Sequence, residues 1–220
     1  MTVSRKRTAV LISGRGSNML SLIEAAKDPA YPAEIVLVVS NRPDAGGIAR
    51  AESFGIPARV LDHKTYGRDR EAFERELDAM LVAEGIELVV LAGFMRLMTP
   101  WFVERWNGRM INIHPALLPS FKGLHTHERA LEAGVRLHGA TVHFVSPGMD
   151  EGAIIAQGAV PVLSGDTPEA LGARVLTVEH QIYPQALALV ASGQVQLEDG
   201  KAVCRAAAED AEGLLTAPRW

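Results

Sequence analysis

The sequence predicts an α/β protein with an open, mostly parallel twisted sheet, helices on both faces and a short hairpin near its carboxyl end. Two observations predict this class. Short apolar runs alternate along the chain with longer segments whose apolar residues recur at helical spacing. The runs, such as 8–13 and 87–92, are almost unbroken in hydrophobicity, which is typical of strands buried on both faces. In parallel sheets built this way, ligands bind at the carboxyl ends of the strands.

Length and composition narrow the class further. The 220 residues are 48% hydrophobic, so we expect one domain over residues 1–220, with a loosely ordered tail from about 205 to 220. The net charge of -4 argues against nucleic acid as a partner. A lone cysteine, Cys204, excludes an internal disulfide framework and favours a reducing, cytoplasmic compartment. No early apolar run is long enough for a signal or membrane segment, so we expect no membrane partner.

The first strand, at 8–13, leads into a Gly-Arg-Gly-Ser-Asn turn at 14–18 and then a helix. The glycines let a ligand approach the backbone, and the free N–H groups of the helix suit a phosphate, helped by the Ser17 hydroxyl. A dinucleotide site would need a small residue where Met19 stands and an acid after the second strand, and both are missing. The turn therefore favours a monophosphate, although a tight turn without a ligand has the same pattern.

The next elements are read from apolar periodicity and glycine breaks. We expect strands at 34–40, 57–61 and 87–92 and helices at 46–54 and 69–84. The strand at 87–92 runs into an apolar loop at 93–98 that holds one cation, Arg96, before a helix that begins at Pro100. An apolar loop at a strand end suits a flat ring, but methionine and phenylalanine in an ordinary core explain it equally well.

The apolar run 110–113 ends in two prolines, so the strand must turn outward at His114. Asn112 and His114 are two residues apart, which puts both side chains on one face. A second strand, at 138–146, leads into a loop that carries Asp150 between glycines. A carboxylate beside His114 would favour the imidazolium and hold its orientation. The alternative is a histidine that only caps a strand edge.

The remaining elements follow in order. We expect a helix at 126–133 and a strand at 154–162. A long helix begins at Asp166-Thr167-Pro168-Glu169, where a capping side chain precedes a proline in the first turn. Pro184 is predicted to kink or split that helix. Residues 194–204, interrupted by Asp199-Gly200, predict the terminal hairpin.

Five segments, in order and spacing from about residue 8 to about 190, resemble the phosphoribosylglycinamide formyltransferases, folate-dependent enzymes of purine synthesis. They lie at 14–18, 91–96, 112–119, 123–127 and at Asp150 with Gly152. One departure is Ala116, where the family usually has serine. The resemblance implies a Rossmann-like formyltransferase fold and transfer of a formyl group from 10-formyltetrahydrofolate, the cosubstrate, to the amine of glycinamide ribonucleotide. It implies no metal and no covalent enzyme intermediate, and a monomer or homodimer.

By the same resemblance, Asn112, His114 and Asp150 form the catalytic set. As the amine attacks, the formyl oxygen gains negative charge, which the Asn112 amide and a protonated His114 can stabilise. Asp150 would keep His114 cationic and help to move the proton from the amine to the departing folate nitrogen.

The resemblance also assigns binding residues. The ribonucleotide set is Gly16, Ser17, Asn18 and Glu179; otherwise Glu179 would be expected on a solvated helix face. The folate set is Arg70, Met95, Arg96, Leu97, Met98 and Val145, together with the loop 146–150. Leu91, Phe102 and Val145 are expected to wall the pteridine pocket. The two arginines suit the anionic glutamate tail.

Four alternatives remain open. Methionyl-tRNA formyltransferase and formyltetrahydrofolate hydrolase share the Asn-x-His…Asp set, but each adds a domain for which we expect no room here. A metal hydrolase could use His125 and His127, spaced as a ligand pair, with His114 or Asp150. A nucleotide-binding module without catalysis could use the glycine turn alone.

Overall fold

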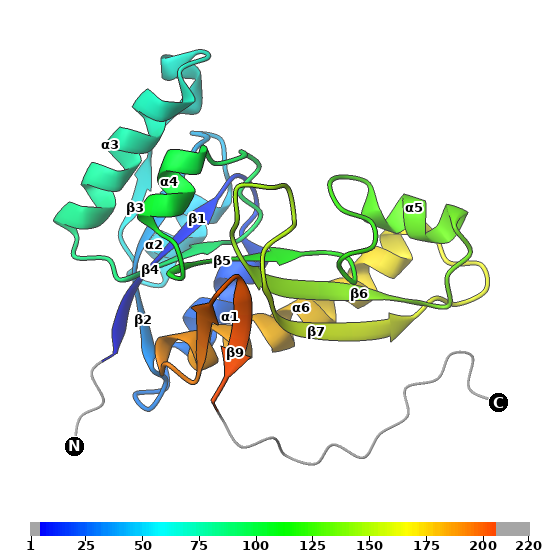
Figure 1. Ribbon diagram of the computed structural model, residues 1–220. Helices are drawn as coiled ribbons and strands as arrows, with labels where there is room; N and C mark the ends of the chain where they lie inside the picture. Colours follow the sequence, from blue (N-terminus) through cyan, green and yellow to red (C-terminus); the bar gives the residue numbers. More distant parts are fainter. Residues whose placement is uncertain (1–4, 206–220) are drawn as a thin grey trace.

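The computed structural model describes residues 5–205 and contains a seven-stranded sheet (Figure 1). The strand order is β3-β2-β1-β4-β5-β6-β7. The strands are β1 (Lys6–Ile12), β2 (Ala33–Ser40), β3 (Ala58–Val60), β4 (Leu88–Leu91), β5 (Met110–His114), β6 (Leu137–Phe144) and β7 (Ile154–Pro161). Strands β1 to β5 pair in parallel, whereas β6 is antiparallel to β5 and β7 is antiparallel to β6. The predicted mostly parallel sheet is confirmed.

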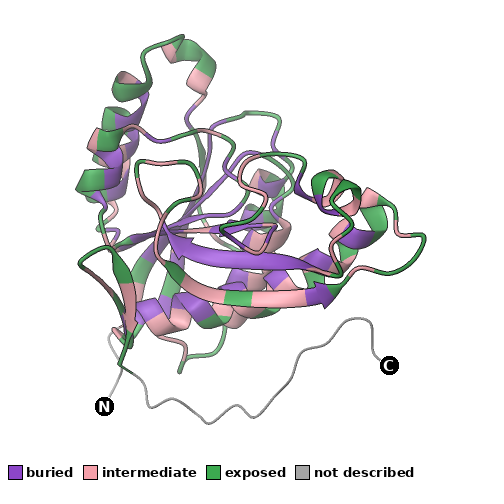
Figure 2. Cartoon of the chain, turned by 45° about the vertical axis from the view of Figure 1, so that its right-hand side comes forward, coloured by how far each residue is buried: buried purple, intermediate pink, exposed green. Residues whose placement is uncertain are grey.

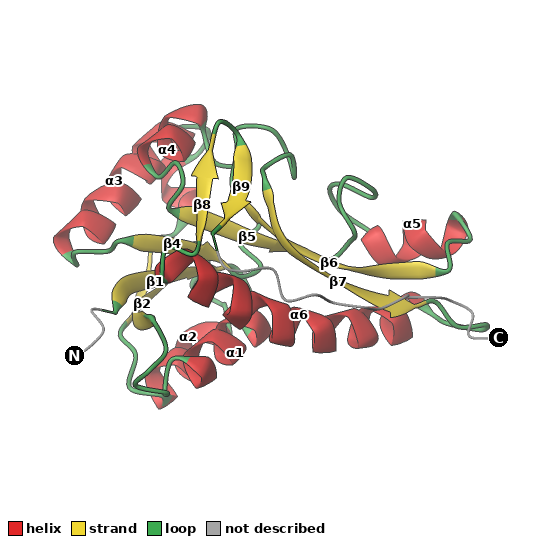
Figure 3. Cartoon of the chain, turned by 60° about the horizontal axis from the view of Figure 1, so that its bottom comes forward, coloured by secondary structure: helices red, strands yellow, loops and turns green. Residues whose placement is uncertain are grey.

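Helices cover both faces of this sheet, as predicted (Figure 3). They are α1 (Ser17–Ala25), α2 (Gly47–Ser53), α3 (Arg70–Ala83), α4 (Pro100–Arg105), α5 (Thr126–Glu132) and α6 (Pro168–Ala191), with a 3-10 turn at His63–Tyr66. Alternate residues of β1 enter two separate cores. Val10 packs into the core with α1, α2 and α6, and its neighbour Leu11 packs into the core with α3 and α4. The strands between the two cores are buried (Figure 2).

Three helices begin where a side-chain oxygen accepts a backbone N–H from the first turn. Asp69 caps α3, Thr99 caps α4 and Thr167 caps α6. The predicted starts of α3, α4 and α6 are therefore confirmed to within one residue. The terminal hairpin is also confirmed, as β8 (Val195–Glu198) and β9 (Lys201–Cys204). Its turn residues, Asp199 and Gly200, both have positive φ, as a type I′ hairpin turn requires.

The long helix was predicted to kink or split at Pro184, and the split is wrong, because α6 is one helix of 24 residues. A proline inside a helix costs about 3 kcal/mol. The residues around Pro184 offset this cost by burial: Tyr183, Ala186 and Leu187 are completely buried. The hydroxyl of Tyr31 also donates to the Pro184 carbonyl at 2.6 Å.

The predicted tail lies, apart from Arg205, outside the described residues. Within residues 5–205, no helix combines the length and the apolar composition needed to cross a bilayer.

Candidate active site

A cavity of about 910 Å³ opens beside the carboxyl ends of β4 and β5. Its walls come from the ends of these strands and of β6, the loop at 93–98, the segment 123–128 that leads into α5, and the connection from β6 to β7. Two polar residues on α1 and α6 complete the lining. The cavity therefore lies where a parallel sheet presents its ligands, as predicted.

His114 lies at the end of β5, and both of its ring nitrogens have neighbours. Nδ1 is 3.4 Å from Oδ2 of Asp150, within ion-pair distance but longer than a charge-assisted hydrogen bond. Nε2 donates to the carbonyl oxygen of Phe121 at 3.0 Å. Only 6% of the His114 side chain and 14% of the Asp150 side chain are exposed. The structure therefore places this imidazole and carboxylate together, shielded from water.

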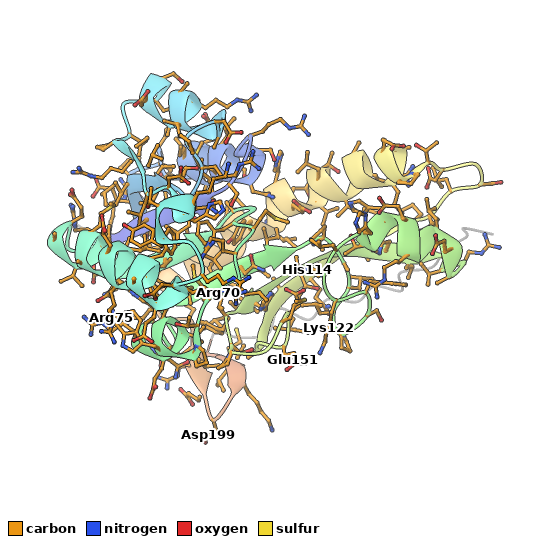
Figure 4. All side chains as sticks on the ribbon, turned by 90° about the horizontal axis from the view of Figure 1, so that it is seen from above. Arg70, Arg75, His114, Lys122, Glu151 and Asp199 are labelled. Atoms are coloured by element: carbon orange, nitrogen blue, oxygen red, sulfur yellow. The ribbon has the colours of Figure 1, made fainter. Side chains whose placement is uncertain are left out.

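Asp150 is held by backbone as well as by charge. Its Oδ2 accepts the N–H of Gly123 at 2.8 Å, and its φ of 52° lies in the left-handed region, which aspartate tolerates better than most residues. At the protein surface, the chain neighbours of these two residues, Lys122 and Glu151, form an ion pair of 2.9 Å between the same two loops (Figure 4). Two contacts thus join the loop after β5 to the loop after β6.

Asn112 also lines the cavity, and its neighbour is a histidine that sequence reasoning left without a role. His143 lies directly opposite Asn112 in the antiparallel pair of β5 and β6. The Nδ2 of Asn112 is 3.2 Å from the Nε2 of His143. Burial lowers the pKa of His143. Opposite residues of an antiparallel pair share a face, so recognising the direction of β6 could have found His143.

The predicted ribonucleotide residues divide into two groups. Asn18 and Glu179 line the cavity, and the Nδ2 of Asn18 donates to the Oε2 of Glu179 at 2.6 Å. Glu179 is only 7% exposed, so a solvated helix face is excluded, and its burial raises its pKa. Gly16 and Ser17 do not line the cavity. They form the start of α1, where Gly16 has the left-handed φ of 71° that favours glycine.

The predicted folate residues mostly lie on the opposite wall. Cavity-lining residues from this set are Leu91, Met95, Arg96, Leu97, Met98 and Val145. Met95, Leu97 and the neighbouring Met149 and Leu124 are large apolar side chains that are 47% to 66% exposed. Such an exposed apolar surface in a cavity suits a flat ring.

Two residues of the folate prediction lie elsewhere. Phe102 is completely buried in the core of α3 and α4, so its expected place in the pocket wall is wrong. Phe102 is the third residue of α4, and the apolar side of this helix faces the sheet rather than the cavity. Arg70, at the start of α3, does not line the cavity. Its positive charge acts on Arg96, whose pKa is lowered by burial and then by Arg70.

The loop at 93–98 is anchored at both ends by buried polar groups. The Oγ of Ser13 accepts the N–H of Met95 at 2.8 Å. The carboxylate of Glu74, 1% exposed, accepts the N–H of Thr99 at 2.7 Å. The exposed apolar side chains of this loop therefore project from a fixed backbone.

His125 and His127, the ligand pair of the metal-hydrolase alternative, have different neighbours. The Nδ1 of His125 is 3.4 Å from the Oε1 of Glu128, and the Nδ1 of His127 is 3.2 Å from the Nε2 of His138. Across residues 5–205, no group of three or more histidine, cysteine, aspartate or glutamate side chains is arranged to hold a metal ion.

Comparison with known proteins gives one consistent result. Residues 6–187 match the formyl transferase family. The phosphoribosylglycinamide formyltransferase of Escherichia coli is 44% identical over 193 residues, which cover 88% of this chain and 91% of that protein. The crystal structure of glycinamide ribonucleotide transformylase 1 from Symbiobacterium toebii superposes with a TM-score of 0.88 at 43% identity, covering 91% of this chain and 94% of that chain.

A larger relative matches over one part of its length. The trifunctional purine biosynthetic protein adenosine-3 of Bos taurus is 50% identical over 200 residues, which are 91% of this chain. The chain spans about a fifth of the length of that relative, since the match covers 20% of it.

Proposed function

The chain belongs to the formyl transferase family, and we propose that it transfers the formyl group of 10-formyltetrahydrofolate to the amine of glycinamide ribonucleotide. One observation carries this proposal. Asn112, His114 and Asp150 meet in a cavity that has a polar pair, Asn18 and the buried Glu179, on one side and an apolar loop on the other. A nucleotide and a folate ring would approach the same three side chains from these two sides.

The proposed chemistry is a direct attack. The amine nitrogen bonds to the formyl carbon, the formyl oxygen becomes negatively charged, and the bond from the carbon to N10 of the folate then breaks. The Asn112 amide donates to the charged oxygen, an interaction worth about 10²–10³-fold in rate. The positive charge of the His114 imidazolium, whose two N–H groups face Phe121 and Asp150, stabilises the same oxygen through space. Because Phe121 accepts the Nε2 proton of His114, a second proton enters at Nδ1, beside Asp150.

The proton balance involves the same pair. The attacking amine loses a proton, and the departing N10 gains one. Asp150 lies beside His114 and, through the Gly123 N–H, is fixed at the cavity wall. We assign to Asp150 the support of the imidazolium and the passage of this proton.

We assign each wall of the cavity to one substrate: the wall of α1 and α6 to the ribonucleotide, and the wall of the loop at 93–98 to the folate. The turn at Gly16, Ser17 and Asn18 would bind the phosphate at the start of α1, and Glu179 would bind the ribose. Met95, Leu97, Met98 and Val145 would contact the pteridine, with Arg96 and, farther out, Arg70 toward the glutamate tail. Both substrates are small metabolites, and we propose the cytoplasm as the site of the reaction.

The decisive assay supplies 10-formyltetrahydrofolate to the purified protein with one of two acceptors and follows the absorbance change of the folate. We expect turnover with glycinamide ribonucleotide and almost none with water alone. Equal rates with both acceptors would mean a hydrolase. Ribonucleotide binding without any formyl transfer would mean a binding module.

A further inference from the structure

His143 on β6 has no step in the proposed mechanism, yet it lies in the wall of the cavity and is 3% exposed. Its two nitrogens have different neighbours. Nδ1 is 2.8 Å from the carbonyl oxygen of Phe144, and Nε2 is 3.2 Å from the Nδ2 of Asn112. The nearest carboxylate oxygen, Oδ1 of Asp150, is 3.9 Å from Nε2, which is beyond hydrogen-bond distance.

These neighbours determine the protonation of the ring. A carbonyl oxygen only accepts hydrogen bonds, so the Nδ1 of His143 carries a proton. Burial lowers the pKa of His143 and so keeps the ring neutral. A neutral imidazole with a proton on Nδ1 has a lone pair on Nε2, which accepts an N–H from Asn112.

We infer that His143 is a positioning residue: held as the Nδ1–H tautomer by the Phe144 carbonyl, it fixes the amide of Asn112 with its nitrogen toward the reacting oxygen. The amide group is nearly the same shape in its two flipped orientations, so packing alone discriminates poorly between them. An acceptor at Nε2 selects one orientation and leaves the second N–H of Asn112 for the formyl oxygen. The opposite orientation would present a carbonyl oxygen to a developing negative charge. This inference rests on the proposed function.

Gly152 supports this tautomer of His143, because the residue leaves room for the Phe144 carbonyl that accepts the Nδ1 proton. A Cβ at Gly152 would lie 1.6 Å from the Phe144 carbonyl oxygen and 3.1 Å from the Nδ1 of His143. No side chain fits there unless that carbonyl moves. The absence of a side chain at Gly152 therefore leaves the Phe144 carbonyl in place to accept the hydrogen bond from His143.

The two histidines of the site have opposite tautomers. In His114, the Phe121 carbonyl holds the proton on Nε2, and Nδ1 faces Asp150 and can take a second proton. In His143, the backbone holds the proton on Nδ1, and Nε2 faces a neutral amide. One ring is placed to become a cation and the other to remain a neutral acceptor.

The first test measures the tautomer without any substrate. Nitrogen-15 NMR of the imidazoles of the whole protein, from pH 5.5 to 8, with the His143→Gln spectrum for assignment, reports which nitrogen carries the proton. We expect the His143 ring to be protonated on Nδ1 alone at pH 7 and above. An Nε2–H tautomer, or an imidazolium at pH 7, would overturn the inference. Failure of formyl transfer in the wild-type protein would refute the proposed function and leave this measurement standing.

The second test is a double-mutant cycle in the transfer assay. His143→Leu should lower kcat about 10-fold to 100-fold and leave KM for both substrates within about twofold, because the lost alignment matters only as charge develops. His143→Gln should recover part of the loss, since its amide oxygen can accept from Asn112. In an Asn112→Ala background, His143→Leu should cost nothing further, and the pH profile of His143→Gln should keep the wild-type shape.

The control is His138→Leu, which removes another buried imidazole of the same strand, one that contacts His127 instead. We expect its effect to be the same in both backgrounds. A full loss from His143→Leu in the Asn112→Ala background, or the disappearance of one limb of the pH profile, would show that His143 acts directly and not through Asn112. If His143→Leu does not fold, the wild-type tautomer and the rate of His143→Gln decide the question.

Discussion

The parallel and antiparallel parts of the sheet contribute to the site in different ways. In the parallel part, polar groups follow the strands: Asn18 comes after β1, and Asn112 and His114 end β5. In the antiparallel part, β6 runs the other way, so His143 lies beside Asn112 within the sheet. The connection from β6 to β7 then returns to bring Asp150 to His114.

The two sides of the site should therefore differ in function, one in binding and the other in catalysis. The wall built from α1 and α6 offers fixed groups for binding, whereas β6 and its following loop supply the groups that act on His114 and Asn112. Changes on the first wall should therefore alter KM, and changes around the antiparallel strand should alter kcat. Four predictions, beginning with the largest expected effect, test this comparison.

The largest effects should come from His114→Ala and Asp150→Asn. Each should lower kcat by about 10²–10⁴-fold, the range of positioned acid and base groups. The KM for ribonucleotide should stay nearly unchanged, because these interactions strengthen only as charge develops. Steady-state kinetics with both substrates measure this. The matched control is Glu151→Gln, which neutralises the adjacent, exposed carboxylate; similar losses in this control, or parallel losses in binding, would contradict this difference between the two sides.

On the wall built from α1 and α6, Ser17→Asp should raise KM for ribonucleotide and leave kcat nearly unchanged. It places a negative charge at the proposed phosphate seat at the start of α1. We expect KM for ribonucleotide to rise about tenfold or more, since a like-charge contact of this kind costs about 1–2 kcal/mol, while folate affinity stays the same. Ser53→Asp, at an exposed end of α2, is the control. A defect confined to folate would reverse the assignment of the two walls.

Glu179→Gln should weaken ribonucleotide binding and make the folded protein more stable. Burial raises the pKa of Glu179 above its ordinary value of 4.5, so between the unfolded and the folded pKa the native state holds a proton that the unfolded chain has released. The native state therefore binds more protons, and its stability falls as pH rises above about 4.5, where the unfolded chain ionises. The variant removes this loss and keeps an acceptor for Asn18.

We expect Glu179→Gln to raise the melting temperature at pH 7 by about 2–4 °C, the change that about 1 kcal/mol produces in a protein of this size. The gain should shrink toward pH 4, and thermal melts over this range measure it. A gain that is independent of pH would mean that the carboxylate is not the cause. A lower melting temperature at pH 7 would show that the charge is stabilising.

The smallest effect should come from Lys122→Met. It removes the exposed ion pair with Glu151, whose two side chains are 38% and 57% exposed. Exposed pairs contribute about 0–1 kcal/mol, so the melting temperature should change by less than about 3 °C. The stronger link between the loops is the partly buried hydrogen bond from the Gly123 N–H to Asp150. A large loss of kcat in Lys122→Met would mean that the surface ion pair, and not this hydrogen bond, positions Asp150.

Local rules predicted much of the fold. The buried strands were visible as apolar runs, the helix starts as capping residues and prolines, and the hairpin turn as Asp199-Gly200. The unbroken course of α6 through Pro184 was not visible, because the compensation comes from residues of other elements, such as Tyr31, that pack against it. Phe102 was misplaced because the family resemblance that put it in the pteridine pocket does not say which side of α4 faces the cavity, and its side chain packs into the core of α3 and α4.

The site was predicted as residue types and only partly as an arrangement. The pattern Asn-x-His and a later aspartate indicated the chemistry, and the spacing of Asn112 and His114 gave their common face. The partners of these groups come from other segments: Phe121 in the following loop for His114, His143 for Asn112 and Gly123 for Asp150. Each is a contact between segments or across a strand pair, which periodicity does not encode.

The sequence by itself determined the class of sheet, the order of its elements and the polar residues that end its strands, because these depend on the alternation of apolar and polar side chains over short stretches. Only the tertiary structure decided which way β6 runs and hence which ring nitrogen of each histidine is protonated. Those outcomes depend on how the folded backbone aims single carbonyl groups at the rings, and a backbone carbonyl, which every residue carries, leaves no mark in the sequence.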